Sequence, residues 1–136
     1  MYKKLMPFVF LFFAGNVLAN QHPIEIMEYI DDVKIIAYIN DSDIDAETRW
    51  TPFESPPPLS ISDALTAVEH YIKKNSDFTS AALSGIELKK MPRHENIWHY
   101  LVRVKGTIAD KTQAHFYVVL MNGKVISGIR KPDSIK

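Results

Sequence analysis

The stretch from Ser60 to Asn75 is the part of this sequence that most restricts the fold. It follows three prolines, Pro56 to Pro58, which form a stiff extended spacer that cannot join a helix. Ser60 and Asp63 have the spacing of a helix-capping box. Apolar residues then recur at intervals of three and four: Ile61, Ala64, Leu65, Val68, Tyr71 and Ile72. The pattern predicts one amphipathic helix, capped at its end by Asn75, that has to bury a single apolar face.

Downstream of this helix, three segments alternate apolar and polar residues, which is typical of β-strands. They are Leu83 to Met91, Trp98 to Lys105 and Ala114 to Met121. We expect Gly106 to end the second strand and residues 107–113 to form a loop.

Asn122-Gly123 predicts a two-residue hairpin turn into a last strand. A type I′ turn at this position fixes the register of the hairpin. The predicted pairs are Leu120 with Val125, Val118 with Ser127, Phe116 with Ile129, Val119 with Ile126, and Tyr117 with Gly128.

The segment from Ile24 to Ile39 is ambiguous: it has helical spacing at Ile26, Ile30, Val33 and Ala37, and strand alternation at Val33, Ile35, Ala37 and Ile39. The β-branched residues Val33, Ile35, Ile36 and Ile39 favour a strand for the second half of the segment. Together these elements predict an α+β fold, in which one amphipathic helix packs on a four- to five-stranded antiparallel sheet.

The chain opens with Lys3 and Lys4, an apolar run from Leu5 to Ala14, and small residues before Asn20. This is the pattern of a signal peptide over residues 1–19, cleaved after Ala19, with residues 20–136 as a single domain. The run is shorter than the ~20 residues of a spanning helix, so we expect no stable membrane insertion after cleavage. The predicted location is periplasmic or secreted. No cysteine is present, so packing alone must hold the domain together.

Charge is distributed unevenly along a chain of zero formal net charge. Residues 20–47 carry eight acids and one base, whereas residues 86–136 carry ten bases and four acids. We expect the two segments to lie close together and neutralise one another. The balanced total makes nucleic acid an unexpected partner.

Catalytic and cofactor motifs do not emerge from the sequence. It has no Cys nucleophile and no G-x-S-x-G elbow, so a hydrolase is the least favoured class and no cofactor is expected. His94 and His99 are five residues apart, which puts them on different faces of a helix or a strand. The acidic run Asp41, Asp43 and Asp45 lacks the glycine and glutamate of an EF-hand; weak calcium binding there stays open.

Six residues are candidates for contact with a partner: Trp50, Phe53, His99, Leu101, Arg103 and Lys105. The last four share one face of a predicted strand, which we expect to be exposed. Trp50 and Phe53 have two interpretations. They form either an exposed aromatic-proline patch or, as the favoured alternative, a lid folded over the start of the helix.

The helix opening LSISDALTAVEHYI, the strand NIWHYLVRV and the hairpin FYVVLMNGKVIS are similar to cystatin-like proteins, and to PepSY-type secreted modules in particular. The likeness covers residues 59–130. It implies binding or inhibition of a protease or an envelope partner. The Gln-x-Val-x-Gly loop of true cystatins is missing, which argues against inhibition of cysteine proteases.

The expectation is therefore a non-enzymatic periplasmic binding or inhibitory module of unknown ligand, whose partner is another envelope protein. The alternative is a structural, envelope-maintenance protein that self-associates through a sheet edge. The oligomeric state is left open by the sequence.

Overall fold

The protein is α+β, as the sequence predicts, but its strands form two antiparallel sheets rather than one. The computed structural model describes residues 22–132, so the predicted signal peptide lies outside the described residues. One sheet has the order β1-β2-β7 and the other β3-β4-β5-β6. The elements are β1 (Ile24–Ile30), β2 (Val33–Ile39), the 3-10 turns η1 (Asp41–Asp43) and η2 (Ala46–Thr48), α1 (Ile61–Asn75), β3 (Ser80–Lys90), β4 (Trp98–Ile108), β5 (Lys111–Leu120), β6 (Val125–Ser127) and β7 (Ile129–Arg130). No helix among these is long and apolar enough to cross a bilayer.

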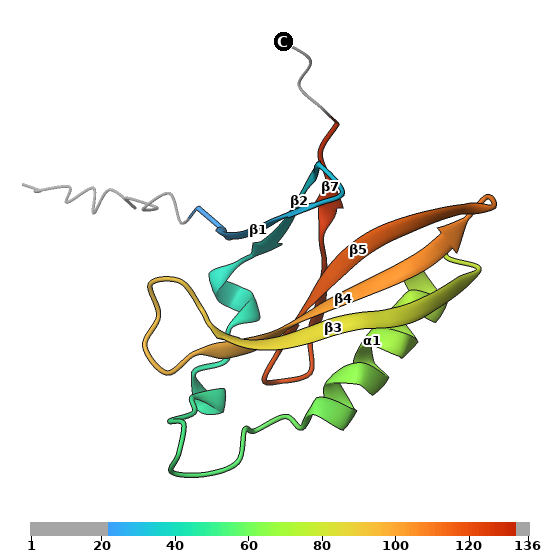
Figure 1. The fold of residues 1–136 in the computed structure, drawn as a ribbon. Helices are drawn as coiled ribbons and strands as arrows, with labels where there is room; N and C mark the ends of the chain where they lie inside the picture. Colours follow the sequence, from blue (N-terminus) through green and yellow to red (C-terminus); the bar gives the residue numbers. More distant parts are fainter. Residues whose placement is uncertain (1–21, 133–136) are drawn as a thin grey trace, which may run out of the picture.

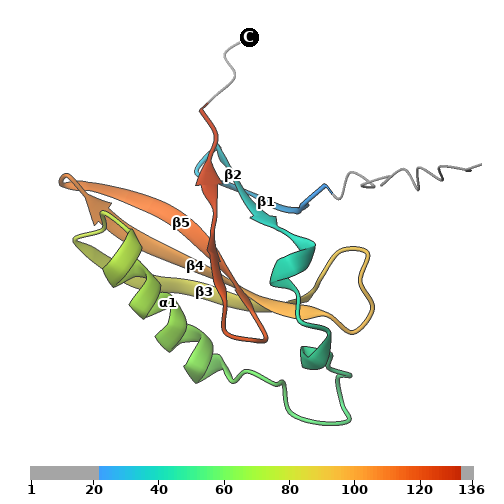
Figure 2. The same cartoon turned by 180° about the vertical axis from the view of Figure 1, so that it is seen from behind.

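Three layers result, because the four-stranded sheet is covered on both faces (Figures 1 and 2). Helix α1 covers one face, where Ala64 and Val68 pack on Tyr100, Val102 and Tyr117. The three-stranded sheet covers the other face and contributes a second apolar core, which includes Ile26, Ile35, Ala37, Ile39, Leu101, Phe116, Val118 and Leu120. Alternate residues of β4 and β5 therefore enter different cores.

Helix α1 confirms the most constrained prediction of the sequence. The hydroxyl of Ser60 accepts a hydrogen bond from the Asp63 N–H at 3.0 Å and caps the first turn. Val68 is buried, and Leu65 and Ile72 are half-buried against the same core. The cap at the other end is Ser76, not Asn75, because its N–H donates to the Ile72 carbonyl.

The N-terminal segment forms a hairpin, so its ambiguous first half is a strand. β1 and β2 pair along their full length, from Ile24 with Ile39 to Ile30 with Val33. Asp31 and Asp32 make the turn with φ angles of 51° and 63°. Asp tolerates this left-handed conformation better than most residues, and two consecutive residues of positive φ are the mark of a type I′ hairpin.

The second strand prediction stops too early, because β4 continues past Gly106 to Ile108. A two-residue turn at Ala109 and Asp110, again with positive φ, joins it directly to β5. The predicted loop over residues 107–113 is therefore wrong. Gly106 serves close packing: a Cβ there would lie 2.3 Å from the Phe78 ring.

The predicted register of the last hairpin is wrong by one residue. Val119 pairs with Val125, Val118 with Ile126 and Tyr117 with Ser127. The turn is longer than two residues: the Leu120 N–H bonds to the Lys124 carbonyl, and only Gly123 has positive φ, at 88°. A three-residue loop that ends in a left-handed glycine is the usual alternative to the type I′ turn.

Gly128 lies where the chain leaves one sheet and enters the other. Its N–H donates to the Phe116 carbonyl at 3.0 Å. A Cβ at this position would lie 2.5 Å from Ile35 Cγ2, so only glycine lets β2 approach the junction between β6 and β7.

Candidate functional site

The sheet face that carries four of the candidate residues is covered, contrary to our expectation. His99 and Leu101 are 1% and 0% exposed. The reason is the β1–β2 hairpin, which packs over this face as a separate sheet. Lys105 is exposed and Arg103 is half-buried, so these two alone reach solvent from the predicted face.

Arg103 ties the two sheets together. Its guanidinium donates hydrogen bonds to Glu28 of β1 and to Glu87 of β3. The bond from Arg103 lowers the pKa of Glu87. Lys124 similarly bonds the carboxylate of Asp43, which lowers the pKa of Asp43. Both ion pairs that cross between the acidic N-terminal and basic C-terminal segments confirm the predicted neutralisation.

Trp50 is buried, which rules out the exposed patch as far as this residue is concerned. It is 8% exposed, and its ring lies edge-on to Trp98 with 5.4 Å between centroids. The indole N–H donates to the Ser55 carbonyl at 2.8 Å and closes the loop between them. Phe53 lies within that loop, fully exposed and with a φ of 73°, so it does not share in the lid.

The histidine and aspartate candidates do not come together. His94 bonds the Pro92 carbonyl, whereas His99 lies in the core, where burial lowers its pKa to about 4. Asp43 and Asp45 accept backbone N–H groups of η1 and η2. Within residues 22–132, no three side chains of His, Cys, Asp or Glu are grouped as metal ligands would be.

His115 and Ser127 form a pair that the sequence does not predict. His115 Nε2 lies 2.8 Å from Ser127 Oγ, and Ser127 donates onward to the Gly128 carbonyl at 3.0 Å. The serine proton is therefore engaged with the backbone, and the imidazole is the donor of the first bond. Burial, aided by the charge of Arg130, lowers the pKa of His115 to about 4. Among residues 22–132 the buried Nδ1 has no hydrogen-bond partner, so no described acid orients the ring as it does in a catalytic triad.

An exposed apolar surface that sequence reasoning missed lies along β3. β3 is the edge of its sheet, and among the described residues no strand pairs with its outer side. Helix α1 makes its main contacts with β4, β5 and β6, whereas from β3 it is Ile86 that packs against the helix-side core, so the helix covers β3 only in part. Leu83 and Leu88 of β3 are 52% and 39% exposed, and Ile61 at the start of α1 is 54% exposed.

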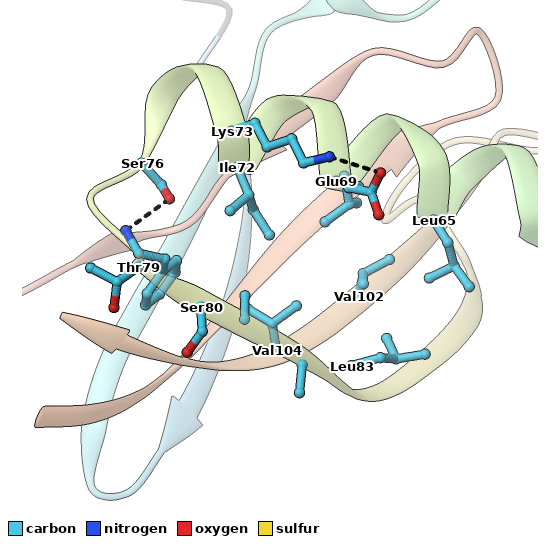
Figure 3. Close-up of a pocket in the computed structure, with 14 residues that line it drawn as sticks. Leu65, Glu69, Ile72, Lys73, Ser76, Thr79, Ser80, Leu83, Val102 and Val104 are labelled. Atoms are coloured by element: carbon cyan, nitrogen blue, oxygen red, sulfur yellow. Dashed lines mark hydrogen bonds and ion pairs between the residues drawn. The ribbon is translucent and has the colours of Figure 1, made fainter. Parts of the chain in front are cut away.

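A groove of about 550 Å³ separates β3 from the C-terminal half of α1. Leu65 and Ile72 point into it from the helix, and Leu83, Val102 and Val104 line it from the sheet (Figure 3). Lys73 and Glu69 form an ion pair at 3.3 Å on its helical side. The floor is therefore apolar and the charged groups stay on the rim.

A second pocket of about 460 Å³ lies further along the same side of β3. Its walls are Ile86 and Leu88 of β3, Tyr100 of β4, and Pro57 and Ile61 from the helix entrance. The hydroxyl of Tyr100 donates to the Leu59 carbonyl at 2.6 Å, which holds the proline segment against the sheet. Pro57 thus forms part of the pocket wall, and the proline segment leads directly into the helix.

The backbone of β3 offers hydrogen bonds to an additional strand. The Met91 N–H donates to the Ile97 carbonyl, so the backbone of Met91 faces β4. Backbone groups of an antiparallel strand face its neighbour at every second residue, so those of Lys89, Glu87 and Gly85 also bond to β4. The N–H and C=O groups of Ile86 and Leu88 consequently face the free edge. Their side chains line the second pocket, so main-chain and apolar contacts are available side by side.

The sequence carries a weak signal for this surface. Residues 80–84, Ser-Ala-Ala-Leu-Ser, include no charge, although edge strands are usually protected by charged residues or proline. A local pattern cannot reveal which strand is at an edge, because strand order is set by long-range pairing.

Comparison with known proteins finds no family model that matches this sequence, and no match among curated proteins or solved structures. The class is therefore defined by the fold and the site alone. The chain is a three-layer α+β protein with an unpaired edge strand beside an apolar groove.

Proposed function

We propose that this protein is a non-enzymatic binding module that captures an extended polypeptide segment by adding it as a strand to the free edge of β3. The observation that carries the proposal is the coincidence of that edge with two apolar pockets on one side of the strand. Strand addition takes its affinity from main-chain hydrogen bonds and its selectivity from pockets for alternate side chains.

The groove supports such a ligand energetically. A fifth strand next to β3 would cover the exposed parts of Leu83 and Leu88 and bring its own side chains against Leu65 and Ile72. Each apolar side chain that becomes fully buried contributes about 1.5–3 kcal/mol, and each new main-chain hydrogen bond about 1 kcal/mol. A segment of a few residues can thus reach micromolar affinity after the entropy of ordering is subtracted.

The signal peptide predicted from the sequence supports a location outside the cytoplasm, and we infer an envelope protein as the partner. The resemblance to PepSY-type and cystatin-like modules that the sequence suggests would imply the same class of function, a binding or inhibitory role. Phe53 on its closed loop and the cation Lys105 are accessible as secondary contacts.

Self-association through the same edge is the alternative function. The uncharged residues 80–84 favour it, because edges without charges pair readily with a second copy. Two β3 strands related by a two-fold axis would form a continuous sheet with both helices on one face. Sedimentation across a wide concentration range tests this alternative, which requires a reversible dimer.

Amide hydrogen exchange tests the main proposal. A synthetic peptide with valine at alternate positions is added to the protein, and exchange is followed for each residue by NMR. We expect protection of the Ile86 and Leu88 amides, which face the free edge, and little change at Glu87, which already bonds to β4.

Two variants of equal exposure provide the control. Leu83→Lys places a charge on the edge and should weaken peptide binding about tenfold or more, whereas Ile129→Lys, at 51% exposure against 52%, should not. Strand addition at this edge is contradicted if the peptide protects amides outside β3 but not those of β3. It is also contradicted if both variants lose the same amount of peptide affinity.

A further inference from the structure

The two pockets have a fixed spacing that can be measured on β4. Leu83, beside the first pocket, pairs with Val104, and Leu88, beside the second, pairs with Tyr100. Val104 and Tyr100 are four residues apart on a regular strand. The bulge between Leu83 and Gly85 absorbs the additional residue of β3.

A regular strand advances about 3.3 Å per residue, so Leu83 and Leu88, one at each pocket, are separated by about 13 Å along the sheet. Side chains on one face of a strand recur every second residue. A ligand strand that fills both pockets must therefore carry its two anchors at positions i and i+4. The position between them, i+2, lies on the same face and meets Ile86, which is half-buried.

The other face of the ligand meets a different surface. On that side β3 presents Ala82, Gly85, Glu87 and Lys89, and Lys105 of β4 is exposed behind Ala82. Side chains at i+1 and i+3 would therefore lie near both charges and solvent. Polar residues suit these positions, because the charged side chains of Glu87, Lys89 and Lys105 lie on this face.

From this spacing we propose that the ligand is a segment of another polypeptide with two leucine-sized apolar side chains four residues apart and polar residues at the odd positions between them. This selectivity rests on the proposed function, because it specifies which polypeptide segments bind to the β3 edge. This pattern is typical of an amphipathic β-strand. Such a segment is available for binding while the protein that contains it has not yet formed its own sheet.

The bulge favours a separate, flexible segment over a second copy of this chain. In a two-fold pair of β3 strands, two bulges would oppose each other near the centre and disturb the ladder on both sides. An unfolded segment has no fixed register or twist of its own and can follow the bulged edge.

Peptides of roughly nine residues and identical composition test the inference. One carries two leucines at i and i+4, one at i and i+3, and both have serine, threonine and lysine elsewhere. We expect the i, i+4 peptide to bind at least about tenfold more tightly, because the i+3 leucine points away from the groove. Ile61→Lys, which places a charge at the second pocket, should abolish this difference.

The outcomes separate the selectivity from the function. If both peptides protect the Ile86 and Leu88 amides with equal affinity, strand addition stands and the spacing rule is wrong. If neither protects them at millimolar concentration, the proposed function fails as well. If the protein alone protects these amides as its concentration rises and sediments as a dimer, the occupant is a second copy and the inference is overturned.

Discussion

Arg103 of β4 bonds the carboxylate of Glu28 across the interface between the two sheets, with their side chains 30% and 20% exposed. Glu28 is half-buried and lies on the same side of β1 as Ile26 and Ile30, which pack in the core between the sheets. The ion pair therefore joins the four-stranded sheet, which the sequence predicts, to the separate three-stranded sheet, which the sequence does not predict.

A double-mutant cycle on this pair should give a coupling free energy of about 1 kcal/mol or more. Arg103→Gln and Glu28→Gln each remove one partner, and urea denaturation measures the free energy of unfolding. The exposed helical pair Lys73 and Glu69 is the control, for which we expect about 0.3–0.5 kcal/mol. Equal coupling in the two pairs would show that burial adds nothing to the Arg103 contact.

Acidification should destabilise the protein through His99 and His115. The pKa of each is lowered to about 4 by burial, whereas an unfolded histidine titrates near 6.5. Between these values the unfolded chain binds more protons, so the free energy of unfolding falls as pH drops from about 6.5 to about 4. Each imidazole contributes roughly 3 kcal/mol over the full window, and nothing further below it.

Variants separate these two histidines from the carboxylates. The pKa values of Asp43 and Glu87 are also lowered, but their stabilisation is lost only below about pH 4.5, so the slope between pH 6.5 and 5 reports the imidazoles. His99→Leu and His115→Phe should each flatten that slope, and the exposed His70→Gln should leave it unchanged. If the free energy of unfolding still falls with the same slope in the double variant, groups other than these two histidines cause the pH dependence.

Phe53→Gly should stabilise the protein by about 1 kcal/mol. Phe53 has a φ of 73° and an exposed ring, so it bears the strain of a left-handed conformation without burial to offset it. Phe53→Ala keeps the strain and should leave the melting temperature nearly unchanged. A lower melting temperature for the glycine variant would mean that the ring has an intramolecular contact.

Gly128→Ala should destabilise the protein by about 1–3 kcal/mol, because the new methyl group would overlap Ile35 Cγ2 and force the two sheets apart. Gly85→Ala is the matched control in another strand. A Cβ at Gly85 meets nothing within 4 Å, so its unfolding midpoint in urea should shift little. Similar shifts in both variants would point to strand propensity rather than to the junction.

What the sequence determined by itself is the set of local elements. The cap at Ser60 and the stripe through Val68 predict α1 almost to the residue, because a helix closes its hydrogen bonds within a few residues. Alternation locates the strands because successive side chains of a strand point to opposite faces of the sheet. The exceptions are turns: Asp31-Asp32 and Ala109-Asp110 adopt positive φ without a glycine, and in the last hairpin only Gly123 does so.

Only the tertiary structure decided which surfaces are covered. Leu101 and Leu83 both lie at apolar strand positions, yet the first is buried under the β1–β2 hairpin and the second is exposed along a free edge. Trp50 is buried by Trp98, forty-eight positions later in the sequence. Burial of a strand face or a side chain in this way depends on contacts between segments that are distant in the sequence. A local sequence pattern carries no information about such contacts. The candidate site along β3 is therefore a property of how the layers stack.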